Sequence, residues 1–266
     1  MPEGDTVHKL AVYLDEALRG QTVTEVRIQG RPYAELCGRA VEGITSEGKH
    51  LFMTFAGGRL LRVHLGLYGA WHRYDLGAAW LKPRQRASLV LTTSCQVFVC
   101  FNAKAIEPMT AGGFAVRDLS HRLGPDLTRE PPPIESLLDR ALTLLDPSVE
   151  VTDLLLDQRI ASGIGNVYKS EVLFLEGCSP RARLGELSIE RLTALYRTAG
   201  RLLMENLGGG PRTTRRVPDG RGILWVYGRA GLECLRCGMP IERAMLGRMP
   251  RSTYWCARCQ CDGHMR

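Results

Sequence analysis

The stretch CLRCGMPIERAMLGRMPRSTYWCARC, residues 234–259, carries the strongest local motif of the sequence. It contains two pairs of cysteines with two residues inside each pair and eighteen residues between the pairs. A CxxC turn lets two thiolates converge on one Zn²⁺ ion, and the intervening segment can return the second pair as a β-hairpin. The spacing predicts one structural zinc ion held by Cys234, Cys237, Cys256 and Cys259. A set of free cysteines or a redox pair is the less favoured alternative.

Three arginines lie between the cysteine pairs, namely Arg243, Arg248 and Arg251. A small zinc hairpin that carries arginines is suited to clamp phosphate groups. Zinc modules also mediate protein contacts, so this pattern alone does not establish nucleic-acid binding.

Upstream, residues 154–174 read LLLDQRIASGIGNVYKSEVLF. This pattern predicts a helix, a pair of glycine-rich turns and a second helix that begins near Ile164. Backbone N–H groups at a helix start, together with Asn166, can receive a phosphate anion. The alternative is a tight turn between helices in which Gly163 and Gly165 only supply unusual backbone angles. The spacing favours neither reading.

The rest of the chain changes character along its length. Residues 6–18 have helical periodicity, and short β-rich pieces follow from residue 22 to about residue 116, which suggests a sandwich or a barrel. The segment REPPP, residues 129–133, suits an interdomain linker because proline continues neither a helix nor a sheet ladder. Helical periodicity then dominates, in residues 136–145, 149–159 and 189–206. We therefore expect an α+β protein of more than one domain.

Composition sets the broad class. The 266 residues are 44% hydrophobic and 24% charged, which is typical of a globular protein, and the formal net charge is +7. A basic chain favours a polyanionic partner, although a solvated basic surface explains the charge equally well. The start MPEGDTVHKL lacks the features of a secretory signal, and no run is long enough for a membrane span. We expect a cytoplasmic protein with no membrane partner.

Several segments in order along the chain carry a resemblance to a known family. They are PEGDT after Met1, GKHL at residues 48–51, HLGLYG at 64–69, LGPDL at 123–127, SGIGNVYKSE at 162–171, VYGRAG at 226–231 and RSTYWCARC at 251–259. Together they resemble the formamidopyrimidine-DNA glycosylase/endonuclease VIII family over the whole chain. Any one of these segments alone would be weak, whereas the set is highly specific.

The resemblance implies an N-terminal β-sandwich, a helical domain with a helix-two-turns-helix motif, and a C-terminal zinc finger β-hairpin. It implies a bifunctional DNA glycosylase/lyase of base excision repair, a monomer that binds damaged double- or single-stranded DNA and associates with the nucleoid. The expected boundaries are 1–118 for the catalytic sandwich with its leading helix, 119–148 for a linker and connecting helix, 149–228 for the helical domain and 229–266 for the zinc finger.

The resemblance also assigns the chemistry. Removal of Met1 exposes Pro2, whose secondary amine attacks the sugar carbon that carries the damaged base. An α-amine has a reference pKa of about 8, so an unprotonated fraction exists at neutral pH. Glu3 takes the general acid/base role, although a solvated terminal acid would be the ordinary reading of that residue alone.

Further residues match the family at positions that contact DNA. Lys49 corresponds to a lysine that holds a phosphate beside the lesion and belongs to the catalytic set. Asn166 and Arg251 correspond to residues that grip the phosphates flanking the extruded nucleotide, with Arg251 also counted as catalytic. His64 begins the segment whose side chains enter the gap left by the flipped base. Leu67 and Tyr68 are the candidate wedge, with core packing as the alternative.

The start PEGDT and the sequence LYG after Gly66 are closer to the endonuclease VIII branch, which favours oxidised pyrimidines as substrates. Two residues depart from that pattern: Thr6 replaces a common glutamate, and Gly66 replaces a polar gap-filling side chain. The alternatives are a purine-directed enzyme that excises formamidopyrimidines or 8-oxoguanine, and a non-catalytic protein that binds damaged DNA.

Overall fold

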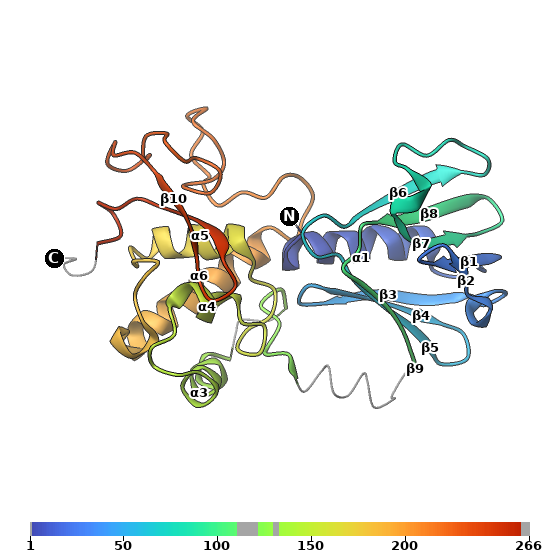
Figure 1. Ribbon diagram of the computed structural model, residues 1–266, viewed down its shortest axis with the longest axis horizontal. Helices are drawn as coiled ribbons and strands as arrows, with labels where there is room; N and C mark the ends of the chain where they lie inside the picture. Colours follow the sequence, from blue (N-terminus) through green and yellow to red (C-terminus); the bar gives the residue numbers. More distant parts are fainter. Residues whose placement is uncertain (1, 111–121, 130–132, 262–266) are drawn as a thin grey trace. The chain divides into compact units, whose positions relative to one another are not determined.

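The computed structural model describes residues 2–110, 122–129 and 133–261, and the chain forms two compact units, Met1–His121 and Arg122–Arg266 (Figure 1). The expected boundary at residues 118/119, the end of the β-rich region at 111–116 and residues 130–132 of the expected linker lie outside the described residues. The four expected domain ranges stay a prediction.

The first unit begins with helix α1, Gly4–Leu18. Its buried positions include Val7, Ala11, Leu14 and Leu18, so one apolar stripe faces the core at helical spacing. Gly20, with φ of 78°, follows the helix end and supplies the left-handed conformation that this stop requires. The helix expected over residues 6–18 is confirmed, with an earlier start.

Two antiparallel sheets follow, and Figure 1 shows them as separate layers. One has the order β2-β1-β7-β8-β6 and the other the order β3-β4-β5-β9. The strands are β1 (Glu25–Ile28), β2 (Arg31–Pro32), β3 (Val41–Glu47), β4 (His50–Phe55), β5 (Arg59–His64), β6 (Ala70–Asp75), β7 (Ala87–Thr92), β8 (Gln96–Phe101) and β9 (Ala105–Thr110).

The two sheets bury a shared core, so the first unit is a β-sandwich and not a barrel. In β4 the residues Leu51, Met53 and Phe55 are buried, and the residues between them are partly exposed, as the two-residue period of a strand requires. The same core contains Leu89 from β7 and Phe98 from β8, together with the buried stripe of α1.

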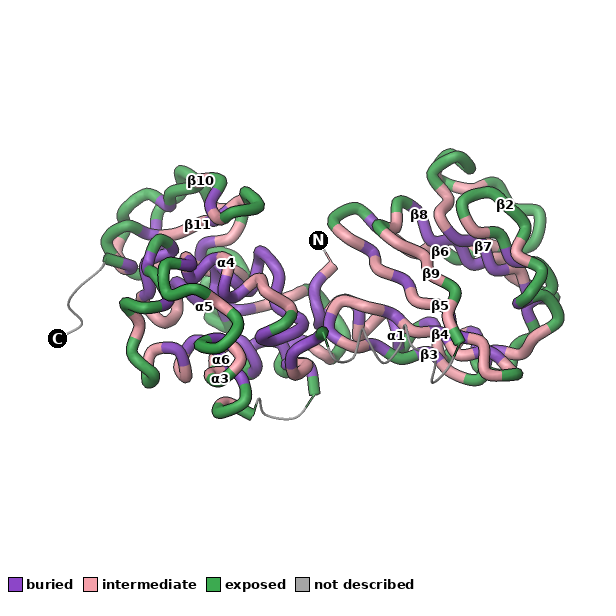
Figure 2. Tube along the Cα trace, turned by 60° about the horizontal axis from the view of Figure 1, so that its bottom comes forward, coloured by how far each residue is buried: buried purple, intermediate pink, exposed green. Residues whose placement is uncertain are grey.

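The second unit is mainly helical. Its helices are α3 (Ile134–Leu144), α4 (Val151–Leu156), α5 (Asn166–Leu175) and α6 (Ile189–Glu205), and it ends in the hairpin of β10 (Glu242–Leu246) and β11 (Arg251–Trp255). Helix α5 is buried from Asn166 to Phe174 and forms the centre of the unit (Figure 2). Among the described residues, no helix has the length and apolar character that a membrane span needs.

Helix α4 is shorter than expected. We expected one helix over residues 149–159, but α4 ends at Leu156. The Asp157 carboxylate accepts hydrogen bonds from the backbone and side chain of Arg159, and the Gln158 side chain bonds the carbonyl of Leu156 and the N–H of Gly163. These contacts replace the next helical turn and begin the two turns that lead into α5.

Candidate functional site

The chain start leads directly into a buried acid. Pro2 is half-buried, and Glu3 is the N-cap residue of α1 with its side chain fully buried. The N–H of Val7 bonds the Glu3 carbonyl over 3.0 Å, so the backbone of Glu3 is fixed to the helix. The N–H groups of the first helical turn point toward this end of α1 and stabilise negative charge there. The reading of Glu3 as a solvated terminal acid is therefore wrong.

The next turn of α1 carries a second buried acid. Asp5 is 1% exposed, and Lys9 lies 3.9 Å from its carboxylate. Thr6, at the position where relatives often carry glutamate, is half-buried and donates its hydroxyl to Asp5 over 3.3 Å. The acidic character of this end of α1 is thus retained by Glu3 and Asp5.

Lys49 lies in the tight turn between β3 and β4. Glu47 pairs with His50, which leaves Gly48 and Lys49 as the two central residues of the hairpin. Gly48 has φ of 56°, as glycine at the first position of such a turn permits. This turn places the half-buried Lys49 at the end of the sheet, beside the first residue of β4.

His64, the last residue of β5, lies beside His50 with the two ring centroids 4.8 Å apart. Arg62 Nη1 lies 2.8 Å from His50 Nδ1, so this ring nitrogen accepts the hydrogen bond. Burial, His64 and the neighbouring cations Arg62, Lys49 and Lys104 lower the pKa of His50 to about 3. Burial and the same three cations lower the pKa of His64 to about 4. Both imidazoles are therefore neutral at pH 7 and can offer a phosphate a hydrogen bond but no charge.

The candidate wedge residues are on the surface. Leu67 is 41% exposed and Tyr68 is 78% exposed, whereas Leu65 before them is buried. The N–H of Gly69 bonds the carbonyl of Leu65 over 3.1 Å, which closes a turn with both side chains outside. Core packing of Leu67 and Tyr68 is therefore excluded, and their role as a wedge stays a prediction.

Gly66 is required by its surroundings. Its φ is 65°, and a Cβ atom added there would lie 2.9 Å from the Cβ of Lys104. A larger residue would meet both a strained backbone and a steric conflict. In this loop conformation, position 66 therefore disfavours any side chain, the polar gap-filling one included.

Asn166 begins α5 after the two expected turns. Gly163 has φ of 109°, and Gly165 is the N-cap residue in an extended conformation. Glycine therefore supplies an unusual angle, and the turns end at a helix start as expected. Phosphate binding at this helix start stays a prediction. Asn166 is 8% exposed, and its Oδ1 accepts a hydrogen bond from the buried Lys169 over 3.3 Å.

Four cysteines converge as the spacing predicts. The sulfur atoms of Cys234, Cys237, Cys256 and Cys259 all lie within 4.8 Å of one another. Sulfur atoms on a tetrahedral Zn²⁺ ion with bonds of about 2.3 Å are about 3.8 Å apart, and the Cys234 to Cys259 separation is 3.8 Å. These four residues hold one structural zinc ion. The spare Cys261 is exposed and lies outside the cluster.

The zinc hairpin is packed on α4 and α5. Cys234 and Cys256 share a buried cluster with Phe174 of α5. At the turn between β10 and β11, the N–H of Arg248 bonds Asp153 of α4 over 2.9 Å. Arg251 is the first residue of β11 and is half-buried. Asn166 and Arg251 therefore belong to neighbouring elements of one unit.

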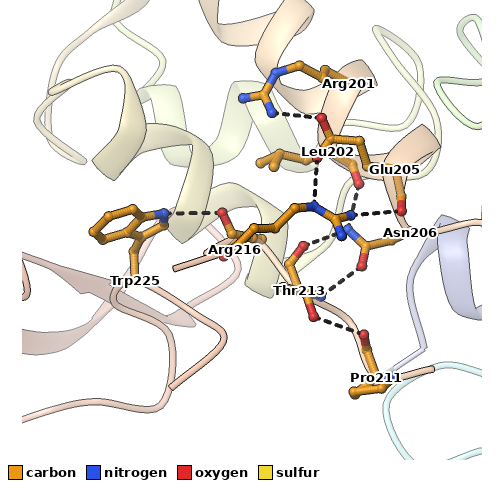
Figure 3. A network of polar contacts seen from close by, with 9 residues as sticks. Arg201, Leu202, Glu205, Asn206, Pro211, Thr213, Arg216 and Trp225 are labelled. Carbon is orange, nitrogen blue, oxygen red and sulfur yellow. Dashed lines mark hydrogen bonds and ion pairs between the residues drawn. The ribbon is translucent and has the colours of Figure 1, made fainter. Parts of the chain in front are cut away.

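The arginine-rich segment between α6 and the hairpin is tied to its own unit. Figure 3 shows Asn206 joined to Thr213 by two hydrogen bonds of 2.7 and 2.8 Å, and Arg216 donating to the Glu205 carbonyl. Arg215 forms an ion pair with Asp219, and its guanidinium holds the pKa of that carboxyl below its usual range. These contacts give a basic segment a fixed local shape.

Sequence reasoning missed two buried charged residues of α5. Lys169 and Glu171 are both fully buried. Glu171 accepts hydrogen bonds from the backbone N–H groups of Trp225, Val226 and Tyr227, at 2.7, 2.8 and 2.8 Å. It thereby anchors the end of the basic segment. The available signal was that both residues stand in a helix rich in apolar residues, NVYKSEVLFL.

Three family models match the chain. They are the formamidopyrimidine-DNA glycosylase N-terminal domain at residues 1–104, the formamidopyrimidine-DNA glycosylase H2TH domain at residues 123–217, and the zinc finger found in FPG and IleRS at residues 231–260. These matches follow the sandwich, the helical region and the zinc hairpin in order.

Relatives match over nearly the whole chain. A probable endonuclease 8 2 of Streptomyces coelicolor is 38% identical, and the match covers 98% of this chain and 94% of that protein. The DNA-(apurinic or apyrimidinic site) lyase Nei2 of Mycolicibacterium smegmatis is 36% identical, with 98% and 99% covered.

The fold is shared with a solved structure. The crystal structure of Lactococcus lactis formamidopyrimidine-DNA glycosylase bound non-covalently to DNA with an AP site superposes with a TM-score of 0.82, at 22% identity, over 98% of this chain and 100% of that one. With its fold, its zinc centre and its full-length relatives, this chain belongs to the formamidopyrimidine-DNA glycosylase/endonuclease VIII family of base excision repair enzymes, which are DNA glycosylases with AP lyase activity.

Proposed function

We propose that this enzyme excises oxidised pyrimidines from DNA and cleaves the strand through a Schiff base on Pro2. The observation that carries the proposal is that Pro2 directly precedes the fully buried Glu3. The proposal takes Met1 to be removed, which makes the Pro2 nitrogen the terminal amine. The relatives named endonuclease 8 and Nei2 support the lyase chemistry and the choice of branch.

The first step joins protein and DNA. The lone pair of the Pro2 nitrogen attacks the sugar C1′, a new N–C1′ bond forms, and the bond between C1′ and the base breaks. The base leaves with the electron pair of that bond and takes up the proton that the Pro2 nitrogen loses. Glu3 then gives a proton to the ring oxygen while the C1′–O4′ bond breaks. The product is an iminium between Pro2 and an open sugar.

The second step cuts the strand. The iminium withdraws electrons, so a proton at C2′ becomes acidic and is removed by a base. The electrons flow to expel the 3′ phosphate by β-elimination, and a further proton loss expels the 5′ phosphate by δ-elimination. Water then hydrolyses the iminium and frees Pro2. Glu3, now ionised, is the group we assign to take up and return these protons.

The remaining predicted residues bind the DNA. Lys49 supplies positive charge for a phosphate beside the lesion, and the neutral His64 donates a hydrogen bond to a phosphate oxygen. Asn166 and Arg251 hold flanking phosphates from the helical unit. Leu67 and Tyr68, both exposed, fill the space left by the extruded nucleotide and restore its stacking.

The metal is structural in this proposal. The four cysteines fill the tetrahedral coordination of Zn²⁺, so no position is left for water or substrate. Zinc fixes the hairpin that carries Arg251. We further propose that the enzyme acts as a monomer on duplex or single-stranded DNA in the cytoplasm, in association with the nucleoid.

Borohydride trapping tests the covalent step. Borohydride reduces the iminium, so the wild-type enzyme should form a stable adduct with DNA that contains an abasic site, and Pro2→Gly should not. Mass spectrometry of the adduct should place the added sugar on the chain's first nitrogen. Tight binding with no adduct would instead indicate a non-catalytic damage-binding protein.

The choice of base needs a separate assay. Oligonucleotides with thymine glycol, dihydrouracil, 5-hydroxycytosine or 8-oxoguanine should be compared under single-turnover conditions. The proposal expects faster excision of the three pyrimidines. Faster excision of 8-oxoguanine would overturn the pyrimidine assignment and favour the purine-directed alternative.

A further inference from the structure

Lys169 of α5 is fully buried, with an exposed fraction of 0%. A buried ammonium group costs free energy unless its N–H donors have partners. Here its Nζ donates to Thr253 Oγ1 over 2.8 Å, to Asn166 Oδ1 over 3.3 Å and to the Ser252 carbonyl over 3.4 Å. One side chain thus joins the start of α5 to strand β11 of the zinc hairpin.

The contact fixes which way the Asn166 amide points. An ammonium group has no acceptor, so only the amide oxygen of Asn166 can face it. The amide nitrogen Nδ2, which is the atom able to donate to a phosphate, is therefore directed away from Lys169. Without this partner the amide could rotate and present its oxygen to the phosphate, which would repel it.

The same ammonium fixes the backbone beside Arg251. Thr253 Oγ1 accepts from Lys169 and donates to the Arg251 carbonyl over 3.2 Å. The Ser252 carbonyl, in the next peptide, also faces the ammonium. The position of the Arg251 backbone therefore depends on the group that also orients Asn166.

A second contact holds the hairpin turn that precedes Arg251, and it does not involve Asn166. Asp153 of α4 accepts from the N–H of Arg248 over 2.9 Å. A Cβ atom at Gly247 would lie 2.4 Å from Asp153 Oδ1, so the turn sits directly on α4. Asp153 therefore provides a matched control, since it anchors the same hairpin through another helix.

We propose that Lys169 is a positioning residue that couples the two DNA phosphate contacts of the helical unit, Asn166 and Arg251. The inference rests on the proposed function, because it takes these two residues as phosphate contacts. Lys169 itself is buried and does not touch DNA. The ammonium group of Lys169 sets the orientation of the neutral Asn166 amide. It also sets the backbone position of the cationic Arg251.

A double-mutant cycle tests the coupling. The probe is a duplex with a tetrahydrofuran abasic analogue, and the readout is its dissociation constant for the full-length, zinc-loaded protein. Asn166→Ala should weaken binding about tenfold in the wild-type background, as loss of a hydrogen bond to a charged group does. In the Lys169→Met background the same change should cost less than about twofold.

A control variant and the salt dependence of binding show whether Lys169 positions the DNA contacts or only stabilises the fold. In the Asp153→Ala background, Asn166→Ala should still cost about tenfold. The slope of log K against log salt should fall by about 1 in Lys169→Met, because the Arg251 phosphate contact is lost. Lys169→Gln, which keeps an N–H donor, should retain part of the coupling and replaces the Met variant if that variant does not fold.

An equal cost of Asn166→Ala in the wild-type and Lys169→Met proteins, both folded and with bound zinc, overturns the inference. No effect of Asn166→Ala in the wild type overturns it as well. Borohydride trapping by the wild-type enzyme tests the Pro2 chemistry separately, so failure of the coupling and failure of the proposed function give different results.

Discussion

The two units use positive charge in different ways. In the first unit, Arg62 and its neighbours surround two half-buried imidazoles at the end of a sheet, and burial together with these cations keeps both rings neutral. In the second unit, Lys169 is fully buried and hydrogen-bonded to two neighbouring elements. The comparison teaches that charged groups near a surface change the pKa of their neighbours, whereas a charged group in a core fixes the positions of its hydrogen-bond partners.

Removal of zinc should have the largest effect on stability and on DNA binding. The structural change should be confined to the second unit. Structural zinc contributes about 10–16 kcal/mol of apparent binding free energy in small zinc peptides, so chelation or Cys256→Ser should unfold the hairpin and abolish tight DNA binding. Hydrogen exchange should increase in residues 231–260 and stay unchanged in β4 and β5. Cys261→Ser, outside the cluster, should keep the zinc, and normal DNA binding without zinc would contradict the structural assignment.

Glu171→Gln should show how much the buried charges of the second unit stabilise it. The amide cannot accept all the N–H donors that the carboxylate accepts, so we expect a loss of about 3 kcal/mol in unfolding free energy. Glu107→Gln is the matched change in the first unit, because Glu107 is 46% exposed and its ion pair with Arg62 should contribute less than about 1 kcal/mol. Urea unfolding measures the free energy that each variant loses. Equal losses would show that the buried and the exposed carboxylates stabilise their units to the same extent.

Acid should weaken the first unit through His50. Its pKa is about 3 in the folded protein and about 6.5 when unfolded, so the unfolded state binds more protons between these values. The contribution of His50 to the unfolding free energy is therefore fully present above pH 6.5. It falls as the pH drops toward 3, by about 1 kcal/mol per pH unit or less. His50→Gln should make this dependence shallower in urea titrations from pH 7 to pH 4. An unchanged slope would mean that His50 is not held neutral.

Tyr68→Ala should have the smallest effect on folding and a clear effect on catalysis. Because Tyr68 is 78% exposed, we expect a change within about 0.5 kcal/mol in unfolding free energy. Base stacking on an aromatic ring contributes about 1–3 kcal/mol, so excision from duplex DNA should slow about tenfold. Leu76→Ala, another exposed apolar residue, serves as the control. A large loss of unfolding free energy in Tyr68→Ala would show that the Tyr68 side chain packs in the core.

The sequence predicted the elements whose signals are local. The stripe of α1 and the two CxxC pairs each require only periodicity or spacing, and both were confirmed. The pairing of β1 with β7 could not be read, because the partners are far apart in the chain and strand order has no local signal. The end of α4 at Leu156 depends on side-chain hydrogen bonds of Asp157 and Gln158 to nearby residues, which hydrophobic periodicity does not contain.

In the candidate site too, local motifs identified some residues, and long-range packing determined the others. The family motifs indicated Pro2, Glu3 and Asn166, and they gave no hint that Lys169 and Glu171 are buried. Lysine and glutamate are among the residues least often buried, so a sequence places them on the surface by default. Only the fold shows that strand β11 and the Trp225–Tyr227 backbone supply their partners.

The tight contact at Gly66 has a consequence for protein engineering. A Cβ atom added at position 66 would lie 2.9 Å from the Cβ of Lys104, so a larger residue at 66 requires a change at 104 as well. A bulkier residue at 66 would need glycine at 104, since every other residue keeps that Cβ atom, or a shifted backbone there. It would also need a backbone at 66 that no longer requires a left-handed angle. Libraries that vary this loop should therefore randomise the two positions together, since a single replacement at 66 meets both a strained backbone and a steric conflict.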